Sequence, residues 1–190
     1  MNKKLDEPQE FANDLIDFVS FSPSKYHVVR NIKAALLRKG FKELPLAEQW
    51  QIDKEGKYFV AQNDTTLVAF IVGMGQPEKD GFRIIAAHTD APTIKIKPSP
   101  EIVVNNSYIK LNTEVYGGAI LNTWFDRPLS IAGRVVMKSK TPFKPEVRQL
   151  IIKRPLLQIP NLAIHFNRKV NDGVPINPQK ELSPLLACVK

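Results

Sequence analysis

The sequence has little of what several large protein classes require. Its 190 residues include one cysteine, Cys188, which cannot form an internal disulfide and is expected to be a small buried apolar residue. A single cysteine suits a reducing compartment, so we expect a cytoplasmic location. No apolar run approaches the roughly 20 residues of a membrane span, and the first residues carry no signal-peptide core. A phosphate-cradling glycine pattern, a Gly-x-Ser-x-Gly elbow and a usefully spaced Cys–His pair are also missing. These absences argue against a disulfide scaffold, a membrane partner, and the common nucleotide-binding and serine or cysteine nucleophile classes.

Positive charge and proline are concentrated in the second half of the chain. Residues 1–90 hold 12 basic and 13 acidic side chains, a balance of −1, whereas residues 91–190 hold 15 and 6, a balance of +9. Proline occurs 4 times before residue 91 and 11 times after it. Two regions of different character therefore meet near residue 91. The net charge of +8 alone suggests a nucleic-acid partner. The basic residues form no clustered stripe, however, so we expect no nucleic-acid partner.

The first region alternates helix and strand patterns. Apolar residues at helical spacing predict a helix through Phe11 and Val19, and a second from Ser24 to Lys39-Gly40. Strand-like runs follow at 57–62, 66–72 and 82–87, with Asn63-Asp64 as a hairpin turn between the first two. The third run is apolar on both faces, which is typical of a buried central strand. The region is expected to be α/β or α+β.

The second region has a different pattern. Residues 93–97 alternate apolar and basic side chains, as a half-buried strand does. Further strand candidates lie at 107–111, 129–138, 146–152 and 162–166, separated by prolines. No convincing amphipathic helix follows residue 91. We therefore predict a β-rich second unit that begins near residue 92.

His88 is the best placed of the three histidines for chemistry. It follows the apolar run at 82–87, and sites in open α/β sheets are usually built at strand ends. Asp90 lies two residues on, so both side chains share one face of an extended segment. A histidine ligand commonly donates its other ring N–H to a carboxylate, which would suit this pair as a metal ligand and its partner. On pattern alone, a strand-end histidine beside a surface aspartate remains the alternative.

The other two histidines have plainer readings. His165 alternates with Leu162, Ile164 and Phe166, so an exposed strand histidine is the simple interpretation. His27 lies in the first turn of the second helix, where a local polar or packing role is expected. Separately, Trp124-Phe125 followed by Asp126-Arg127 indicates either an aromatic anchor beside an ion pair or a packed loop.

Several segments together resemble one family, the M18 metallo-aminopeptidases of the aspartyl aminopeptidase type. The matching stretches occur in family order: Phe18-Val-Ser-Phe-Ser-Pro-Ser-Lys-Tyr-His27, Ala86-Ala-His-Thr-Asp-Ala-Pro92, Lys95-Ile-Lys-Pro98, Glu114-Val-Tyr-Gly-Gly118, Asn122-Thr-Trp-Phe-Asp-Arg127, Ala132-Gly-Arg134 and Pro160-Asn-Leu-Ala-Ile-His165. Each is modest alone, but jointly they are specific and cover nearly the whole chain.

The resemblance implies a two-zinc exopeptidase that removes N-terminal residues from peptides. By family motif His88 would bind zinc, Asp90 would be its partner, and His165 would reach into a neighbouring subunit's active site to hold substrate. The implied fold is α/β: residues 1–91 as the N-terminal part of a zinc-peptidase core, and residues 92–190 as a β-rich inserted dimerisation or lid domain. A peptide substrate and a homo-oligomer are the implied partners.

The resemblance also leaves an active site incomplete. The family's remaining metal ligands and its general base follow the inserted domain, and this sequence contains only the first ligand, His88. A two-zinc site needs about five protein ligands. We therefore expect the N-terminal part of such an enzyme, inactive alone and complemented by a C-terminal half. A non-catalytic oligomerisation or regulatory module derived from such an enzyme is the alternative function.

Overall fold

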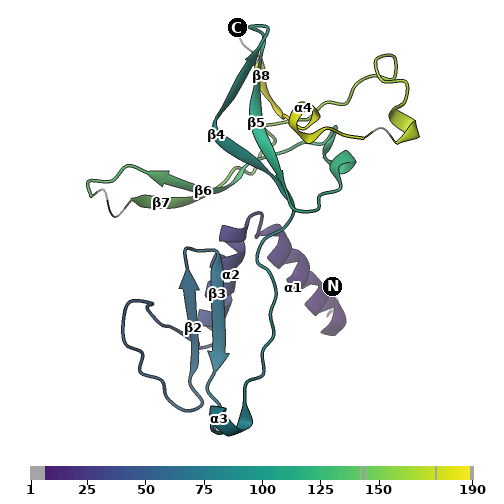
Figure 1. Ribbon diagram of the computed structural model, residues 1–190. Coiled ribbons are helices and arrows are strands. Elements are labelled where there is room, and N and C mark those ends of the chain that lie inside the picture. Colours follow the sequence, from purple (N-terminus) through teal and green to yellow (C-terminus); the bar gives the residue numbers. More distant parts are fainter. Residues whose placement is uncertain (1–6, 142, 144, 174, 189–190) are drawn as a thin grey trace, which may run out of the picture. The chain divides into compact units, whose positions relative to one another are not determined.

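The computed structural model describes residues 7–141, 143, 145–173 and 175–188. The chain forms two compact units, and neither is one continuous stretch (Figure 1). Unit 1 comprises Met1–Asp90 and Ala132–Ile151, and unit 2 comprises Ala91–Ile131 and Ile152–Lys190. Residues 132–151 thus group in space with the first region. The ranges 1–91 and 92–190 stay a prediction about the domains of the family.

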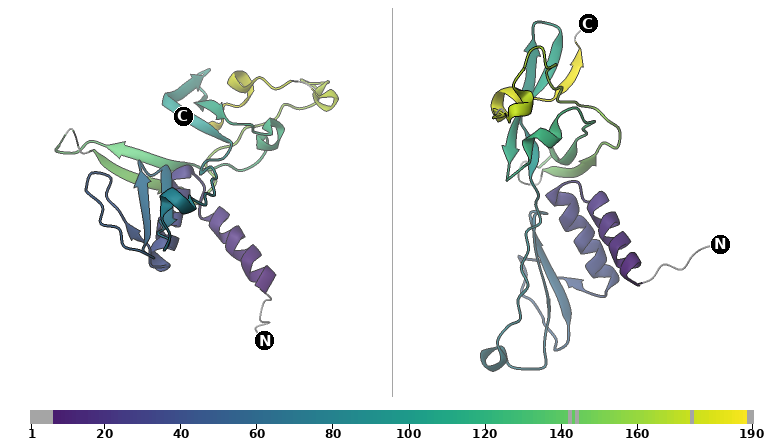
Figure 2. Two further views of the ribbon diagram at one scale, coloured as in Figure 1. Left: turned by 60° about the horizontal axis from the view of Figure 1, so that its bottom comes forward. Right: turned by 90° about the vertical axis from the view of Figure 1, so that its right-hand side faces the viewer.

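Unit 1 begins with the two expected helices, α1 (Glu7–Ser20) and α2 (Lys25–Arg38). Ser24 precedes α2 in an extended conformation, and the helix gives way at Lys39 to Gly40, whose φ of +81° ends it in the region glycine favours. In Figure 2 (right), α2 lies between the sheet of unit 1 and α1. Helix α1 has no buried residue, so its apolar side chains, such as Phe11 and Leu15, are exposed.

A three-stranded sheet forms the other layer of unit 1. Strand β1 (Lys42–Glu43) pairs in parallel with β2 (Lys57–Gln62), and β2 pairs antiparallel with β3 (Thr66–Ile71). The predicted hairpin turn is confirmed, since Asn63 and Asp64 both have φ of 53°, the conformation of tight hairpin turns. Phe59 on β2 and Val29 on α2 are fully buried and form the core.

A second hairpin completes unit 1. Strand β6 (Ala132–Met137) pairs antiparallel with β7 (Glu146–Ile151), and β6 lies against α2. Arg134 donates to the carbonyl oxygen of Asn63 at 3.0 Å and stacks over the ring of Tyr26 at 4.6 Å. Gln149 donates to the carbonyl oxygen of Tyr26 at 3.2 Å. These contacts hold the hairpin to the N-terminal stretch.

The predicted strand at 82–87 is wrong for this structure. The chain leaves the short helix α3 (Pro77–Asp80) and runs through 82–88 without regular structure, every residue exposed. Apolarity on both faces indicated burial, but a strand forms only when another strand completes its ladder. No described strand pairs with this run.

Unit 2 is β-rich, as predicted. Strand β4 (Thr93–Val104) pairs antiparallel with β5 (Tyr108–Tyr116), which also pairs antiparallel with β8 (Leu185–Cys188). The register between β4 and β5 shifts between Ile96 and Glu101, around two prolines that cannot donate to a ladder. Among the described residues of unit 2, the buried apolar side chains include Leu111, Leu157, Ile159 and Leu182.

Short helical turns occupy the rest of unit 2: η1 (Leu121–Trp124), η2 (Val170–Asp172) and α4 (Pro178–Glu181). Two expectations fail here. Residues 162–166 form a turn, in which Phe166 donates its N–H to the carbonyl oxygen of Ala163 at 2.8 Å, and not a strand. Cys188 is exposed on β8 and not buried. Among the described helices, none has the length and apolarity to cross a membrane.

Candidate functional site

His88 and Asp90 form a hydrogen-bonded pair at the end of the exposed segment in unit 1. The His88 Nδ1 atom lies 2.7 Å from the backbone carbonyl oxygen of Asp90 and 3.1 Å from its carboxylate Oδ1. Between them, the Thr89 hydroxyl donates to the carbonyl oxygen of Thr65 at 2.8 Å. That bond ties residue 89 to Thr65, which directly precedes β3 (Thr66–Ile71) in the hairpin that the sequence predicted.

In a neutral His88 ring, the contact with Asp90 sets which nitrogen carries the proton. A carbonyl oxygen only accepts hydrogen bonds, so Nδ1 carries the proton and donates it to Asp90. The Nε2 atom of the neutral ring then carries its lone pair, which is the form that binds a metal ion. The His88 side chain is 80% exposed, so a metal can reach it.

The donor set around His88 is too small for a complete zinc centre. Across the described ranges, no group of three or more His, Cys, Asp or Glu side chains could hold a metal ion. Zinc in proteins takes about four ligands, of which a catalytic site supplies three or more from the polypeptide. The residues present therefore fit zinc as one ligand with its carboxylate partner, and not as a closed site.

His165 lies in unit 2, on the exposed turn at 162–166. The loop that carries it is held at its start by Asp126, whose backbone N–H donates to the carbonyl oxygen of Ile159 at 2.9 Å. The Asp126 carboxylate Oδ1 accepts from the N–H of Asn161, also at 2.9 Å. Asp126 has a φ of +54°, in the left-handed region. The two bonds straddle Pro160 and fix where the loop departs.

The sequence interpretation of this stretch needs one correction. Among the described residues Asp126 and Arg127 form no ion pair with each other; Arg127 instead donates to the carbonyl oxygen of Thr123 at 3.2 Å. Trp124 is half-buried at the end of η1, so the packed-loop alternative describes it better. The sequence alone did not indicate that Asp126 bridges to Asn161, because the two residues are 35 positions apart.

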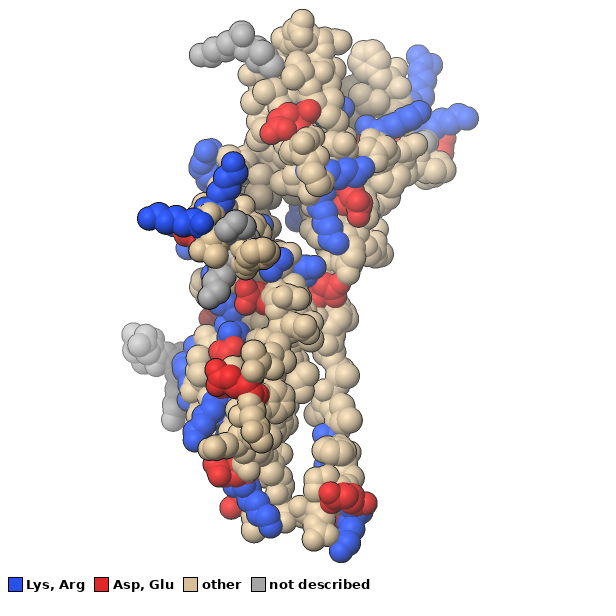
Figure 3. Space-filling view, turned by 60° about the vertical axis from the view of Figure 1, so that its left-hand side comes forward, with Lys and Arg blue, Asp and Glu red and all other residues tan. Residues whose placement is uncertain are grey.

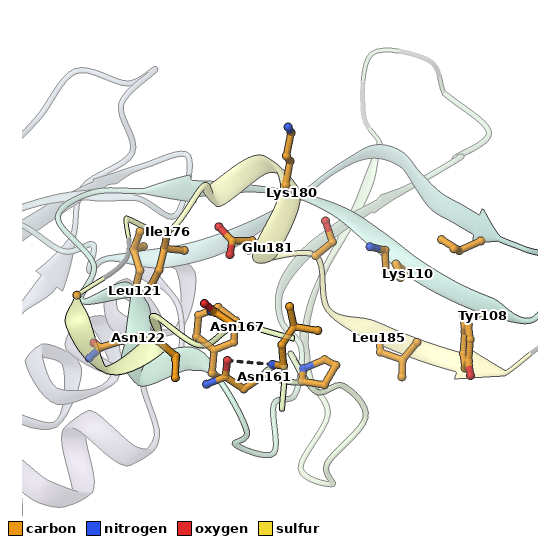
Figure 4. Close-up of a pocket in the computed structure, with 17 residues that line it drawn as sticks. Tyr108, Lys110, Leu121, Asn122, Asn161, Asn167, Ile176, Lys180, Glu181 and Leu185 are labelled. Atoms are coloured by element: carbon orange, nitrogen blue, oxygen red, sulfur yellow. Dashed lines mark hydrogen bonds between the residues drawn. The ribbon is translucent and has the colours of Figure 1, made fainter. Parts of the chain in front are cut away.

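A cavity of about 860 Å³ opens in unit 2 beside the loop that carries His165 (Figure 4). Its lining combines apolar side chains with three amides, and among these residues are Leu121, Asn122, Asn161, Asn167, Ile176 and Leu185. Glu181 lies at its edge, where its carboxylate accepts from the N–H of Asn177 at 2.5 Å; Asn177 itself caps α4, since its side chain accepts from the N–H groups of Gln179 and Lys180. Lys180 points away from the cavity in Figure 4. Lys110 also lines the cavity, so the lining offers amide, ammonium and carboxylate groups beside its apolar side chains.

His27 has a structural environment in unit 1. Its side chain is fully buried, Nδ1 lies 2.7 Å from the Ser24 hydroxyl, and Nε2 has no hydrogen-bond partner. Burial lowers the pKa of His27 below its ordinary value of 6.5, and the neighbouring Arg30 cation lowers it further. The local packing role expected from the sequence agrees with this environment.

Comparison with known proteins covers nearly the whole chain. Residues 18–190 match the family described as aminopeptidase I zinc metalloprotease (M18). A probable M18 family aminopeptidase 2 from Clostridium acetobutylicum is 58% identical over 180 residues, which are 95% of this chain and 42% of that protein. This chain therefore spans less than half the length of that relative.

Solved structures share the fold. Chaetomium thermophilum mApe1 matches with a TM-score of 0.84 and 33% identity, covering 96% of this chain and 41% of the other. A chain of the Ape4 and Nbr1 complex matches with a TM-score of 0.86 and 38% identity, covering 93% and 34%. The S. cerevisiae mApe1 dodecamer matches with a TM-score of 0.74 and 26% identity, covering 97% and 49%. The expected α/β fold is confirmed, and the chain belongs to the M18 family of zinc metallo-aminopeptidases.

Proposed function

We propose that this chain supplies part of a two-zinc aminopeptidase that releases N-terminal residues from peptides. The observation that carries the proposal is the His88–Asp90 pair, in which Nδ1 donates to Asp90 at 2.7 Å and Nε2 is left to bind metal. Bound zinc would polarise the scissile carbonyl and activate water. Asp90 would hold the His88 ring in the tautomer and direction that zinc needs.

The remaining ligands must come from polypeptide outside these 190 residues, whether in the same chain or another. The described part holds no group of three or more candidate metal ligands, and the C. acetobutylicum relative is more than twice as long as the matched stretch. In this proposal residues 1–91 are part of the catalytic domain and residues 92–190 form the dimerisation or lid domain. The 190 residues alone would not hydrolyse peptides.

His165 would act on substrate from a neighbouring subunit. Its exposed turn is held at one end by Asp126 and projects no other titratable side chain between residues 162 and 166. One solved relative, S. cerevisiae mApe1, is a dodecamer, which supports an oligomer for this protein too. On the face drawn in Figure 3, Lys and Arg alternate with Asp and Glu along unit 1, so unit 1 offers nucleic acid no basic stripe on that face.

A complementation assay tests the proposal. The chain is co-expressed with the part of the C. acetobutylicum relative that it does not match, and release of N-terminal residues from a peptide is followed with zinc present. We expect peptide turnover when the two polypeptides are co-expressed, and none from this chain alone. His88→Ala should abolish turnover, whereas Lys54→Ala, which changes an exposed residue between β1 and β2, should leave it unchanged.

Steady peptide release by the purified chain with zinc would contradict the incomplete site. A pair that assembles but stays inactive would favour the alternative, a non-catalytic oligomerisation or regulatory module. That alternative is supported by the described residues, among which no group of three or more His, Cys, Asp or Glu side chains could hold a metal ion. His165→Ala should lower turnover by the assembled pair while leaving zinc content unchanged, as a substrate-holding role requires.

A further inference from the structure

The cavity of unit 2 has walls that hydrogen bonds hold in place (Figure 4). On one side α4 packs on β5, and the Gln179 side chain donates from Nε2 to Asn112 Oδ1 at 3.3 Å. Lys97 donates from Nζ to Gln179 Oε1 at 3.1 Å. On the other side, the bond from the N–H of Asn161 to Asp126 at 2.9 Å holds the loop that follows. A cavity whose walls are fixed in this way is preformed, as small-ligand sites usually are.

The lining places apolar side chains beside amides with unused hydrogen-bonding capacity. Leu121, Phe125 and Ile176 are half-buried and line the cavity. The side chains of Asn122 and Asn167 line it too, and neither forms a hydrogen bond with another described residue. A side-chain amide has an acceptor oxygen and N–H donors, so it matches the C=O and N–H of a peptide group. The lining therefore suits a ligand that combines apolar side chains with peptide groups.

Lys110 on β5 gives the cavity a cation that has no carboxylate partner within the described part of the chain. Figure 4 shows Lys110 toward the end of the cavity away from Asn122, whereas Lys180 points away from the cavity. Glu181 also lines the cavity, but its carboxylate already accepts from the N–H of Asn177. One unpaired ammonium group near an occupied carboxylate favours a ligand with a single negative charge over a phosphate, which carries about two.

We propose that this cavity binds the C-terminal end of a short peptide with apolar side chains. Lys110 would pair with the terminal carboxylate, and the amides of Asn122 and Asn167 would hydrogen-bond the peptide groups. The apolar side chains of the peptide would pack against Phe125 and Ile176. The inference rests on the proposed function, in which peptides are the substrates and shortened peptides the products, and it names the ligand that unit 2 holds.

The size of the cavity favours a peptide over a free amino acid. At roughly 30 Å³ for each water-sized group, a cavity of about 860 Å³ has room for about 29 non-hydrogen atoms. By the same measure the tripeptide Leu-Ala-Leu, with about 22 such atoms, fills most of the space, whereas leucine, with about 9, leaves most of it to water. An acyl chain of similar size would cover the amides without giving them hydrogen-bond partners, which is costly.

Calorimetric titration of the 190-residue chain with Leu-Ala-Leu tests the inference. We expect saturable binding of one tripeptide per chain, with a dissociation constant below about 1 mM. The same tripeptide with an amidated C-terminus lacks the negative charge, so it should bind about fivefold more weakly. Free leucine should bind more weakly than either tripeptide. The inference would be overturned by equal binding of the acid and the amide, or by no saturable binding up to about 10 mM.

Two lysine variants locate the charge that recognises the carboxylate. Lys110→Gln should bind the acid and the amidated tripeptide equally, because the cation that distinguishes them is gone. Lys180→Gln is the matched control, since it removes the same charge from a side chain that points away from the cavity, and it should keep the fivefold difference of about the wild-type size. A preference for the acid that persists in Lys110→Gln, or that disappears in Lys180→Gln, would overturn the assignment.

Asn122→Leu tests the amides without touching a charge. Leucine is similar to asparagine in size but cannot hydrogen-bond, so both tripeptides should bind about fivefold more weakly. Asn122 is exposed, so this variant should fold as the wild type does, which a urea titration verifies. Unchanged binding in folded Asn122→Leu would overturn the role of the amides.

The outcomes separate this inference from the proposed function, because the titration needs neither zinc nor turnover. Tripeptide binding by a chain whose co-expressed pair releases no amino acids supports the peptide site and defeats the aminopeptidase proposal. Release of amino acids by the pair, with no tripeptide binding to the chain, supports the enzyme and overturns the peptide site. Self-association of the chain that blocks tripeptide binding would overturn it in favour of a second copy at this cavity.

Discussion

Asp126 offers a sharp test of how the loop that carries His165 is held. Asp126→Ala removes the acceptor that binds the N–H of Asn161 at 2.9 Å. Because that bond is solvent-exposed, its loss should cost about 0.5–1 kcal/mol, the low end for hydrogen bonds. Alanine must also adopt the φ of +54° that Asp126 has, which costs about 1–2 kcal/mol outside Gly, Asn and Asp. The total is about 1.5–3 kcal/mol.

Two further variants separate these terms. Asp126→Gly loses the acceptor but adopts positive φ freely, so we expect about 1 kcal/mol of destabilisation, including the added freedom of glycine in the unfolded chain. Asp126→Asn keeps an acceptor oxygen and tolerates the left-handed region, so its effect should lie within about 0.5 kcal/mol. The expected order of stability is therefore Asn, then Gly, then Ala.

Urea unfolding followed by the fluorescence of Trp124, two residues from Asp126, measures these differences. A Trp50→Phe background removes the other tryptophan, which lies in unit 1. Equal destabilisation by Ala and Gly would refute the argument from backbone strain. Stability unchanged in all three variants would refute the view that Asp126 holds the loop.

Three further predictions concern unit 1 and β8. Because burial lowers the pKa of His27, the unfolded chain binds more protons than the folded chain, so the free energy of unfolding should fall as the pH drops below 6.5. His27→Gln should flatten that pH dependence, as measured by urea titrations at pH 5.5 and 7.5. A wild-type stability unchanged between those pH values would contradict the buried neutral ring. Thr89→Val should remove the hydrogen bond to Thr65 and speed amide exchange at residues 88–90, whereas Thr89→Ser should keep both unchanged. Equal exchange rates in the two variants would show that the Thr89 hydroxyl does not anchor the turn. Cys188 should react with one equivalent of a thiol reagent in the folded chain, and reaction only after denaturation would contradict its exposure.

The sequence predicted those helices and turns whose boundaries are set by residues a few positions away. Ser24 before α2, Gly40 after it, and Asn63-Asp64 between β2 and β3 set backbone conformations within a few residues, so pattern alone located those boundaries. The strands predicted at 57–62 and 146–152 agree with β2 and β7 to within one residue. Each of them pairs with a neighbouring strand to which a short connection joins it.

The sequence failed where structure depends on distant or absent partners. The run at 82–87 has the composition of a central strand, but composition does not say whether its neighbours are present. Residues 162–166 alternate like a strand, yet the bond from Asn161 to Asp126 fixes the chain before them and a turn follows. For the candidate site, the pattern brought His88 and Asp90 together, whereas the anchor from Thr89 to Thr65 had no local signal. The roles of His88, Asp90 and His165 stay predictions.

The grouping of residues 132–151 with unit 1 has a consequence for biosynthesis. The face of α2 that receives β6 is synthesised early, since α2 ends at Arg38 and 113 further residues are added before β7 ends at Ile151. At about 5–20 residues per second, that face stays bare for about 6–23 seconds in every round of translation. Unit 1 therefore cannot fold to completion as the first finished domain of a nascent chain. It must wait, partly open, while the β4–β5 hairpin of unit 2 emerges ahead of the strands that unit 1 still lacks.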